Sequence, residues 1–202
     1  MGMAPLRLLP LAASCLILSV AASCTTRPVR ETTTRKQLSV PTEIQGYPCA
    51  AGYAWFFADG RLSSCFVSRE TTFGEVNAPE KSWIYLGHNG NPRFVFLAHD
   101  ATINGYPCRG GGHDYSTAVY PSGKLKTCWL AADSVVDGVP CMRAGFTADV
   151  FGSGVETDFH ENGRLKLCKL SRDVTIDGHA FRQGDHIHFD ASGRIAQTSS
   201  SP

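Results

Sequence analysis

The chain has 202 residues, with 19 Lys and Arg against 18 Asp and Glu, so its formal net charge is +1. Such a balance excludes a strongly basic protein, and nucleic acid is not an expected partner. The chain also contains eight cysteines, so the compartment in which it folds decides whether they are paired.

The first 23 residues are predicted to be a secretory targeting segment. Arg7 supplies a short positive region, residues 8–20 form an apolar run, and the small residues 21–23 precede Cys24. The apolar run is too short for a comfortable membrane span. We therefore expect residues 1–23 to be removed on export.

The motif VAASC, residues 20–24, resembles the lipobox of bacterial lipoprotein signal peptides. This resemblance implies that Cys24 becomes the lipidated first residue of the mature chain. It also implies, through Thr25, an anchor in the outer membrane that faces the periplasm. Two alternatives stay open: ordinary cleavage near Ala22, which leaves Cys24 as a free thiol, and lipidation of Cys15. Removal of Cys15 and lipidation of Cys24 leave an even six cysteines to pair.

Residues 24–37 are expected to be a disordered tether. Their sequence has no apolar periodicity and is rich in threonine and basic residues. A flexible segment of this length would hold the folded part roughly 20 Å from the membrane. Its basic residues either contact anionic headgroups or remain solvated without a partner.

A repeated unit occupies residues 38–197. Five copies align on a turn glycine within the motifs ADGR, HNGN, PSGK, ENGR and ASGR, and Asp-Gly, Asn-Gly and Ser-Gly suit tight hairpin turns. Five residues after each glycine lies an equivalent position, and successive positions are 30, 33, 40 and 30 residues apart. Such a period is typical of a repeat protein. The turn glycines are Gly60, Gly90, Gly123, Gly163 and Gly193.

Each unit is predicted to be a β-hairpin preceded by a kinked arm, as in residues 103–130. The residue four before each turn glycine is apolar and is expected to face the core. A connector with a central acidic residue, such as Asp100, is expected to turn between units. Prolines in the arms should mark edges or bends. The expected core residues are Phe56, Leu86, Val119, Phe159 and Phe189, and the arm prolines are Pro48, Pro107 and Pro140.

These patterns predict an all-β fold. No segment after the targeting region shows a sustained helical period, so no helix is expected there. We predict five tandem hairpin repeats that form an extended or rolled antiparallel sheet. Residues 198–202 are expected to be a disordered tail.

The six remaining cysteines are predicted to pair within units. In the second unit the two aligned positions hold Ala78 and Val95, and in the fifth they hold Phe181 and Thr198. Joint loss of both cysteines is what bonded partners predict. Reduced packing cysteines or a zinc cluster are the alternatives, although gaps of 16, 20 and 27 residues do not suit zinc. The predicted pairs are Cys49–Cys65, Cys108–Cys128 and Cys141–Cys168.

The segment ENGRLKLCKL and its relatives ADGRLSSC and PSGKLKTC resemble MORN-like hairpin repeats. The resemblance covers most of residues 38–197 at the level of motifs, although the cysteines and the IxGYPC arm depart from the family pattern. It implies a row of stacked hairpins, commonly a scaffold or binding surface and seldom a catalyst.

Two sets of residues are candidates for a binding site. Tyr53, Trp55 and Phe57 alternate along one strand and are a candidate glycan-binding or protein-binding stripe, unless the glycine-containing arm or the amino-terminal segment covers them. His160, His186 and His188, with Asp158 nearby, have the chemistry of weak metal ligands. The alternative is that these imidazoles simply face water.

No motif for a known reaction is present in the sequence. The loop 109–114 lacks the features of a phosphate-binding loop, and we interpret its glycines as a flexible arm. Residues 152–154 do not form a nucleophile elbow. No cofactor is expected.

We therefore expect a non-enzymatic, lipid-anchored protein of a bacterial envelope that presents a rigid, disulfide-stapled interaction surface. Its partners would be the membrane, through the lipid, and an envelope protein or a glycan. The alternatives are a glycan-binding or small-ligand-binding module that uses the aromatic residues, and a metal-dependent enzyme.

Overall fold

The computed structural model describes residues 32–145 and 156–199. The chain divides into two units, residues 1–30 and residues 31–202, and all described residues belong to the second. The predicted targeting segment and Cys24 therefore lie outside the described residues. Within the described residues every regular element is a β-strand.

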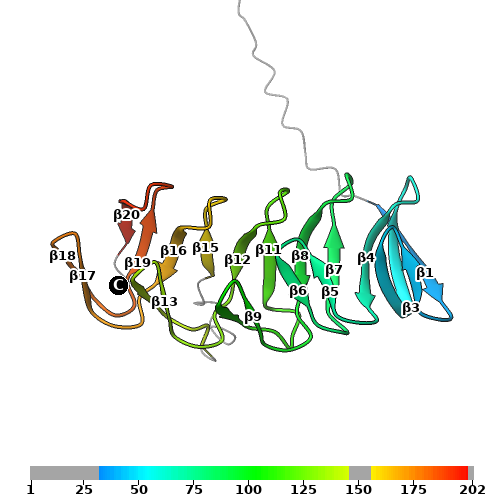
Figure 1. Ribbon diagram of the computed structural model, residues 1–202, viewed down its shortest axis with the longest axis horizontal. Coiled ribbons are helices and arrows are strands. Elements are labelled where there is room, and N and C mark those ends of the chain that lie inside the picture. The colour runs from blue at the N-terminus through cyan, green and yellow to red at the C-terminus, as the bar shows by residue number, and fades with distance from the viewer. Residues whose placement is uncertain (1–31, 146–155, 200–202) are drawn as a thin grey trace, which may run out of the picture. The chain divides into compact units, whose positions relative to one another are not determined.

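Five long β-hairpins, one for each predicted unit, follow one another along the chain (Figure 1). The five turn glycines have φ between 78° and 86°, which confirms the predicted role of glycine at these turns. The outgoing strands are β3 (Tyr47–Phe57), β7 (Trp83–Leu86), β11 (Ser116–Val119), β15 (Thr157–Phe159) and β19 (His186–Phe189). The returning strands are β4 (Leu62–Val67), β8 (Pro92–Phe96), β12 (Leu125–Cys128), β16 (Leu165–Lys169) and β20 (Ile195–Ser199).

A short hairpin precedes each long one. The prediction of a kinked arm at this position is therefore wrong. The arm is the second strand of a hairpin whose two-residue turn is, in the third unit, Asn104-Gly105 with φ of 52° and 83°. Positive φ at both central residues defines a type I′ turn. The short hairpins pair β2 (Thr42–Ile44) with the start of β3, β5 (Thr71–Phe73) with β6 (Val76–Ala78), β9 (Ala101–Ile103) with β10 (Tyr106–Cys108), β13 (Ser134–Val136) with β14 (Val139–Cys141), and β17 (Val174–Ile176) with β18 (His179–Phe181).

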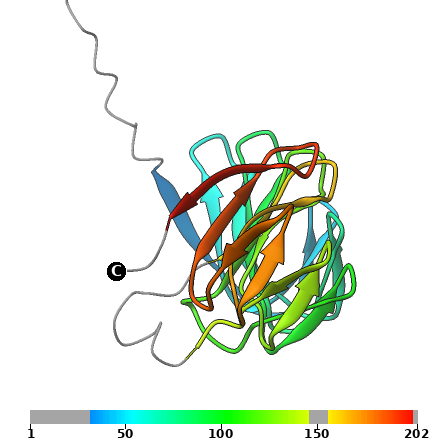
Figure 2. The same cartoon turned by 90° about the vertical axis from the view of Figure 1, so that its left-hand side faces the viewer.

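The long hairpins form one antiparallel sheet. Its order is β1 (Thr33–Leu38), β3, β4, β7, β8, β11, β12, β15, β16, β19 and β20, with β2 paired to β3 beside this path. The path has two free ends, so the sheet is open. Figure 2 looks along the row of hairpins from the end that holds β20.

The ends of the repeat domain differ from the sequence expectation. Residues 33–37, expected to belong to the disordered tether 24–37, instead form most of strand β1, which pairs with β3 from Thr33 opposite Phe57 to Leu38 opposite Gly52. Strand β20 extends to Ser199, two residues into the expected tail. Polar edge strands of this kind carry little periodic signal because neither face needs to be apolar.

The core lies between the long hairpins and the short hairpins. One inward residue from each long strand between β3 and β19 contributes to a single row that crosses the sheet, and buried residues of the short hairpins belong to the same apolar cluster. All five residues that were expected to face the core are at most 7% exposed. The row runs Ala54, Cys65, Ile84, Val95, Thr117, Cys128, Thr157, Cys168 and Ile187.

Three disulfides join the two layers, and each lies within one unit as predicted. The bonds are Cys49–Cys65, Cys108–Cys128 and Cys141–Cys168, each with a Cα–Cα distance of 5.7 Å. The first cysteine of each pair ends the three-residue stretch that follows a short-hairpin turn, and the second lies on the returning long strand. Each bridge therefore fastens a short hairpin to the long hairpin of its own unit.

The central acidic residue has the same structural role in three of the connectors. Asp100 accepts a hydrogen bond from the backbone N–H of Gly110 at 2.8 Å. Asp133 and Asp173 accept from the backbone N–H groups of Arg143 and Gln183 at 2.8 and 2.7 Å. In all three units the carboxylate thus bridges the base of the short hairpin, ten residues along the chain.

A close backbone contact fixes the second short hairpin against the third long one. The Glu75 N–H donates to the Gly123 carbonyl at 2.6 Å, and a Cβ added at Gly74 would collide with that same carbonyl. Gly74 also has φ of 65°, whereas Gly105 has φ of 83° but open space around it.

We expect Gly74→Ala to be more destabilising than Gly105→Ala. The positive φ alone should cost about 1–2 kcal/mol in either variant. The collision at Gly74 should add roughly 1–3 kcal/mol of overpacking. Urea unfolding of both variants measures the difference, and equal losses would mean that the Gly74–Gly123 contact does not constrain the fold.

Candidate interaction surface

The outward face of the sheet carries a continuous group of aromatic rings on four adjacent strands. Because side chains alternate along a strand, residues beside each inward residue point outward. Ile84 and Val95 are buried, so their neighbours on β7 and β8 form this outer surface. We call the group the aromatic face, and it consists of Tyr53, Trp55, Phe66, Trp83, Tyr85, Phe94 and Phe96.

Trp83 is the centre of the aromatic face. Its ring lies 5.2 Å from Phe66 in a stacked arrangement, 4.7 Å from Tyr85 and 5.4 Å from Trp55. Tyr85 stacks in turn on Phe94 at 4.4 Å. Rings fixed by several neighbours lose little freedom when a ligand binds, so the surface is organised before any contact is made.

The rings are partly accessible to solvent. Tyr53 is 43% exposed and the other six rings are half-buried. Arg35 of β1 places its guanidinium 4.1 Å from the centre of the Tyr53 ring. Burial raises the pKa of Tyr85 to about 12, so its hydroxyl remains protonated at biological pH and can donate a hydrogen bond.

The glycine-rich segment 109–114 meets one edge of this surface. His113 contacts Trp83 edge-on at 5.4 Å and Phe96 at 5.9 Å. The segment is held down by the Gly111 N–H, which donates to the Leu97 carbonyl at 2.9 Å. A Cβ at Gly110 would collide with the His99 backbone, so this glycine is needed for the close approach. The segment therefore borders the aromatic face, while Tyr53 remains exposed.

Two hollows of similar size lie on either side of Trp83. The first, about 360 Å³, is lined mainly by Trp55, Trp83, Tyr85 and Phe94, together with Arg93. The second, about 330 Å³, is bordered by Phe66, Trp83, Phe96 and the glycine-rich segment, together with Lys81 and His113. Each volume is at the small end of the range for ligand sites.

Of the three aromatic residues proposed from the sequence as a binding stripe, two lie on the aromatic face and one does not. Tyr53 and Trp55 lie on the aromatic face. Phe57 does not, because it is 2% exposed and its ring stacks on His88 at 3.9 Å. The sequence interpretation missed the five other rings. Their alternation in WIY and FVF was visible, but which strands are neighbours was not.

The histidines named from the sequence do not converge. His186 and His188 point outward from β19, whereas Nε2 of His160 lies 2.8 Å from the Phe189 carbonyl at a hairpin tip. Asp158 Oδ1 accepts a hydrogen bond from the Thr127 hydroxyl at 2.7 Å. In residues 32–145 and 156–199 no three His, Cys, Asp or Glu side chains are grouped as a metal site would require. Burial first, and then the charges of Lys169 and His188, lower the pKa of His186.

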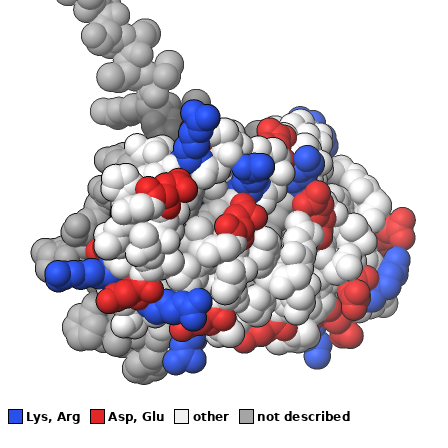
Figure 3. Space-filling view, turned by 60° about the vertical axis from the view of Figure 1, so that its left-hand side comes forward, with Lys and Arg blue, Asp and Glu red and all other residues white. Residues whose placement is uncertain are grey.

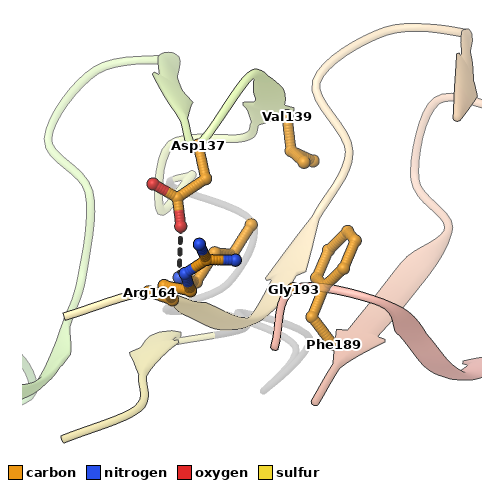
Figure 4. Close-up of a pocket in the computed structure, with 6 residues that line it drawn as sticks. Asp137, Val139, Arg164, Phe189 and Gly193 are labelled. Carbon is orange, nitrogen blue, oxygen red and sulfur yellow. Dashed lines mark hydrogen bonds between the residues drawn. The ribbon is translucent and has the colours of Figure 1, made fainter. Parts of the chain in front are cut away.

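A further hollow of about 370 Å³ lies between hairpin tips and is lined by Asp137, Val139, Arg164, Leu165, Phe189 and Gly193 (Figure 4). The Asp137 carboxylate in this hollow has a structural role, because its Oδ2 accepts a hydrogen bond from the Leu165 N–H at 2.7 Å. Gln45 accepts equivalently from the Leu62 N–H at 3.2 Å. We therefore interpret this hollow as the joint between a short-hairpin tip and a long-hairpin turn.

Charged side chains of both signs lie on the side of the molecule that is turned toward the C-terminal hairpins. Acidic and basic groups are interspersed over this side, which Figure 3 shows.

Across the described part of the chain, no helix long and apolar enough to span a membrane was found. No protein family, curated protein or solved structure was found to match the chain.

Proposed function

We propose that the protein is a non-enzymatic, lipid-anchored component of a bacterial envelope that binds its partner through the aromatic face. The observation that carries this proposal is the unbroken group of seven half-buried or exposed rings on one side of a disulfide-stapled sheet. Contiguous apolar surface that a protein leaves exposed usually marks an interaction site.

Rigidity supports a binding role for this sheet. The rings project from strands of one sheet, and the Cys49–Cys65 bridge fastens the layer beneath them. A surface that is already in its bound arrangement loses little entropy on association. Trp and Tyr are also the residues that most often dominate binding energy at interfaces.

Occupancy of the face can be tested without knowing the ligand. Oxidative footprinting of whole cells and of the purified protein should show that Trp83, Tyr85 and Phe94 react more slowly in the envelope. His188 and Leu167, outward on the polar half of the same sheet, are the matched controls and should react alike in both samples. If the aromatic and polar halves of the sheet were equally protected in the envelope, or if neither were protected, the result would contradict a partner at the aromatic face.

The anchor is a separate part of the proposal. Cys24 precedes the first residue of β1 by nine positions, so an acylated Cys24 could lie at most about 30 Å from the sheet edge. Mass spectrometry of the mature protein should find an acylated amino terminus at Cys24. In the Cys24→Ser variant the protein should leave the membrane fraction, and retention there would refute the anchor.

A further inference from the structure

The two hollows beside Trp83 share an unusual combination of side chains. Each is walled by aromatic rings and each is also lined by a Lys or Arg side chain, Arg93 in the first and Lys81 in the second. Among the described residues that line them, neither hollow includes a carboxylate. Both cations are exposed at the surface.

We propose that the aromatic face binds an acidic glycan, with two consecutive sugars of the chain in the two hollows on either side of Trp83. The inference rests on the proposed function and assigns the chemical class of its ligand. It goes beyond a general interaction surface because it requires both sugar rings and negative charge.

The rings supply the contact with the sugar. The face of an aromatic ring is electron-rich, whereas the C–H groups of a pyranose face carry partial positive charge, so the two stack favourably. Trp83 is shared by both hollows and can therefore contact two successive sugars. Repetition of the same ring-walled hollow along the surface suits a ligand that is itself a repeating chain.

Polar groups among the rings can bind sugar hydroxyls. The Tyr85 hydroxyl, whose pKa burial raises to about 12, can donate a hydrogen bond, and Ser64 lines the first hollow. The buried Nε1–H of Trp83 has no hydrogen-bond acceptor among the described residues. A buried donor without a partner is uncommon in a folded protein, and an ordered water beside the ring would satisfy it.

Charge complementarity selects an acidic chain over a neutral one. A guanidinium such as that of Arg93 binds a carboxylate through two parallel hydrogen bonds, and Lys81 supplies a point charge in the second hollow. Arg35 adds a third cation on the same face, above Tyr53. An acidic peptide and an anionic membrane offer the same charge but lack the sugar C–H faces, so they are the competing occupants.

Tryptophan fluorescence of the full mature chain in mild detergent can decide between these ligands. The probes are oligogalacturonate and peptide-free glycan strands of peptidoglycan, each compared with its methyl ester, which keeps the sugars and removes the charge. Hexaglutamate and phosphatidylglycerol vesicles represent the competing classes. At least one acidic glycan should bind, and esterification should weaken it by about tenfold for each carboxylate that meets a cation.

Variants locate the site. Arg93→Gln with Lys81→Gln should bring the affinity for the acidic glycan close to that of its ester, and both substitutions are at exposed positions that should not disturb folding. Lys169→Gln, a cation on the polar half of the sheet, is the matched control and should have no effect. Trp83→Ala should abolish binding of acid and ester alike.

Several outcomes would overturn the inference. It is wrong if neither acidic glycan binds more tightly than its ester, or if hexaglutamate or the vesicles bind and the glycans do not. Footprint protection at Trp83 and Tyr85 would then still support a partner at this face, so the proposed function would survive. Absence of that protection would remove both.

Discussion

Replacement of both Cys108 and Cys128 by alanine should lower the free energy of unfolding by about 3 kcal/mol, the value for closing a loop of this length. The two residues are 20 positions apart and both are fully buried, and their bond joins β10 to β12 across the core. The bridge therefore restricts the unfolded chain and fastens the two layers of the third unit. Urea unfolding under non-reducing conditions measures the loss.

The single variant Cys108→Ala separates the bridge from packing. It should lose about as much stability as the double variant and should expose one reactive thiol on unfolding. Thiol titration with and without urea detects that group. If the double variant unfolds at the wild-type urea concentration, the bridge does not stabilise the third unit.

Phe73→Ala should cost about 3–5 kcal/mol, the range for removing a fully buried phenylalanine. Phe73 lies on β5 of the second short hairpin, is 0% exposed, and its ring is 6.1 Å from that of Tyr47 in the preceding unit. Its loss would leave a cavity between two units that the surrounding backbone cannot fill. Equilibrium urea unfolding measures the cost.

Thr72→Ala is the matched control, because Thr72 precedes Phe73 on the same strand and is exposed. Its effect should be within about 0.5 kcal/mol of wild type. A similar small effect of Phe73→Ala would mean that the short hairpins lie on the surface of the domain instead of completing its core.

The repeat register was predictable because its signals are local. A glycine at each hairpin turn and an apolar residue four positions earlier recur at fixed offsets, and three of the five units have a cysteine five positions after the glycine. The absence of both cysteines in the units of Ala78 and Phe181 favoured pairing within units over reduced cysteines or a zinc cluster. The structure confirms all three bridges and the turn glycines.

The short hairpins were not predicted, although their turn residues are plain in the sequence. Asn104-Gly105 and Asp137-Gly138 are favourable type I′ pairs. Their strands are only three residues long, however, which is too short for an alternating pattern. Pro107 and Pro140, expected at edges or bends, lie inside these strands, where a two-stranded hairpin leaves one side of each strand unpaired.

The candidate site could be predicted only in part because it is assembled across strands. Tyr53 and Trp55 are close in sequence and were identified. Trp83 and Phe96 join them only through the pairing of β4 with β7 and of β7 with β8. Sequence order within one strand shows alternation, but it does not show which outward residues meet on neighbouring strands.

The pairing of cysteines has a consequence for biogenesis. The three bonds join residues 49 to 65, 108 to 128 and 141 to 168, so each links a cysteine to the next one in the chain. An oxidase that acts on a polypeptide as it emerges from the export channel joins consecutive thiols first. If this chain is exported, as proposed, that order of events yields the native bonds, and its maturation should not depend on an isomerase to reshuffle them.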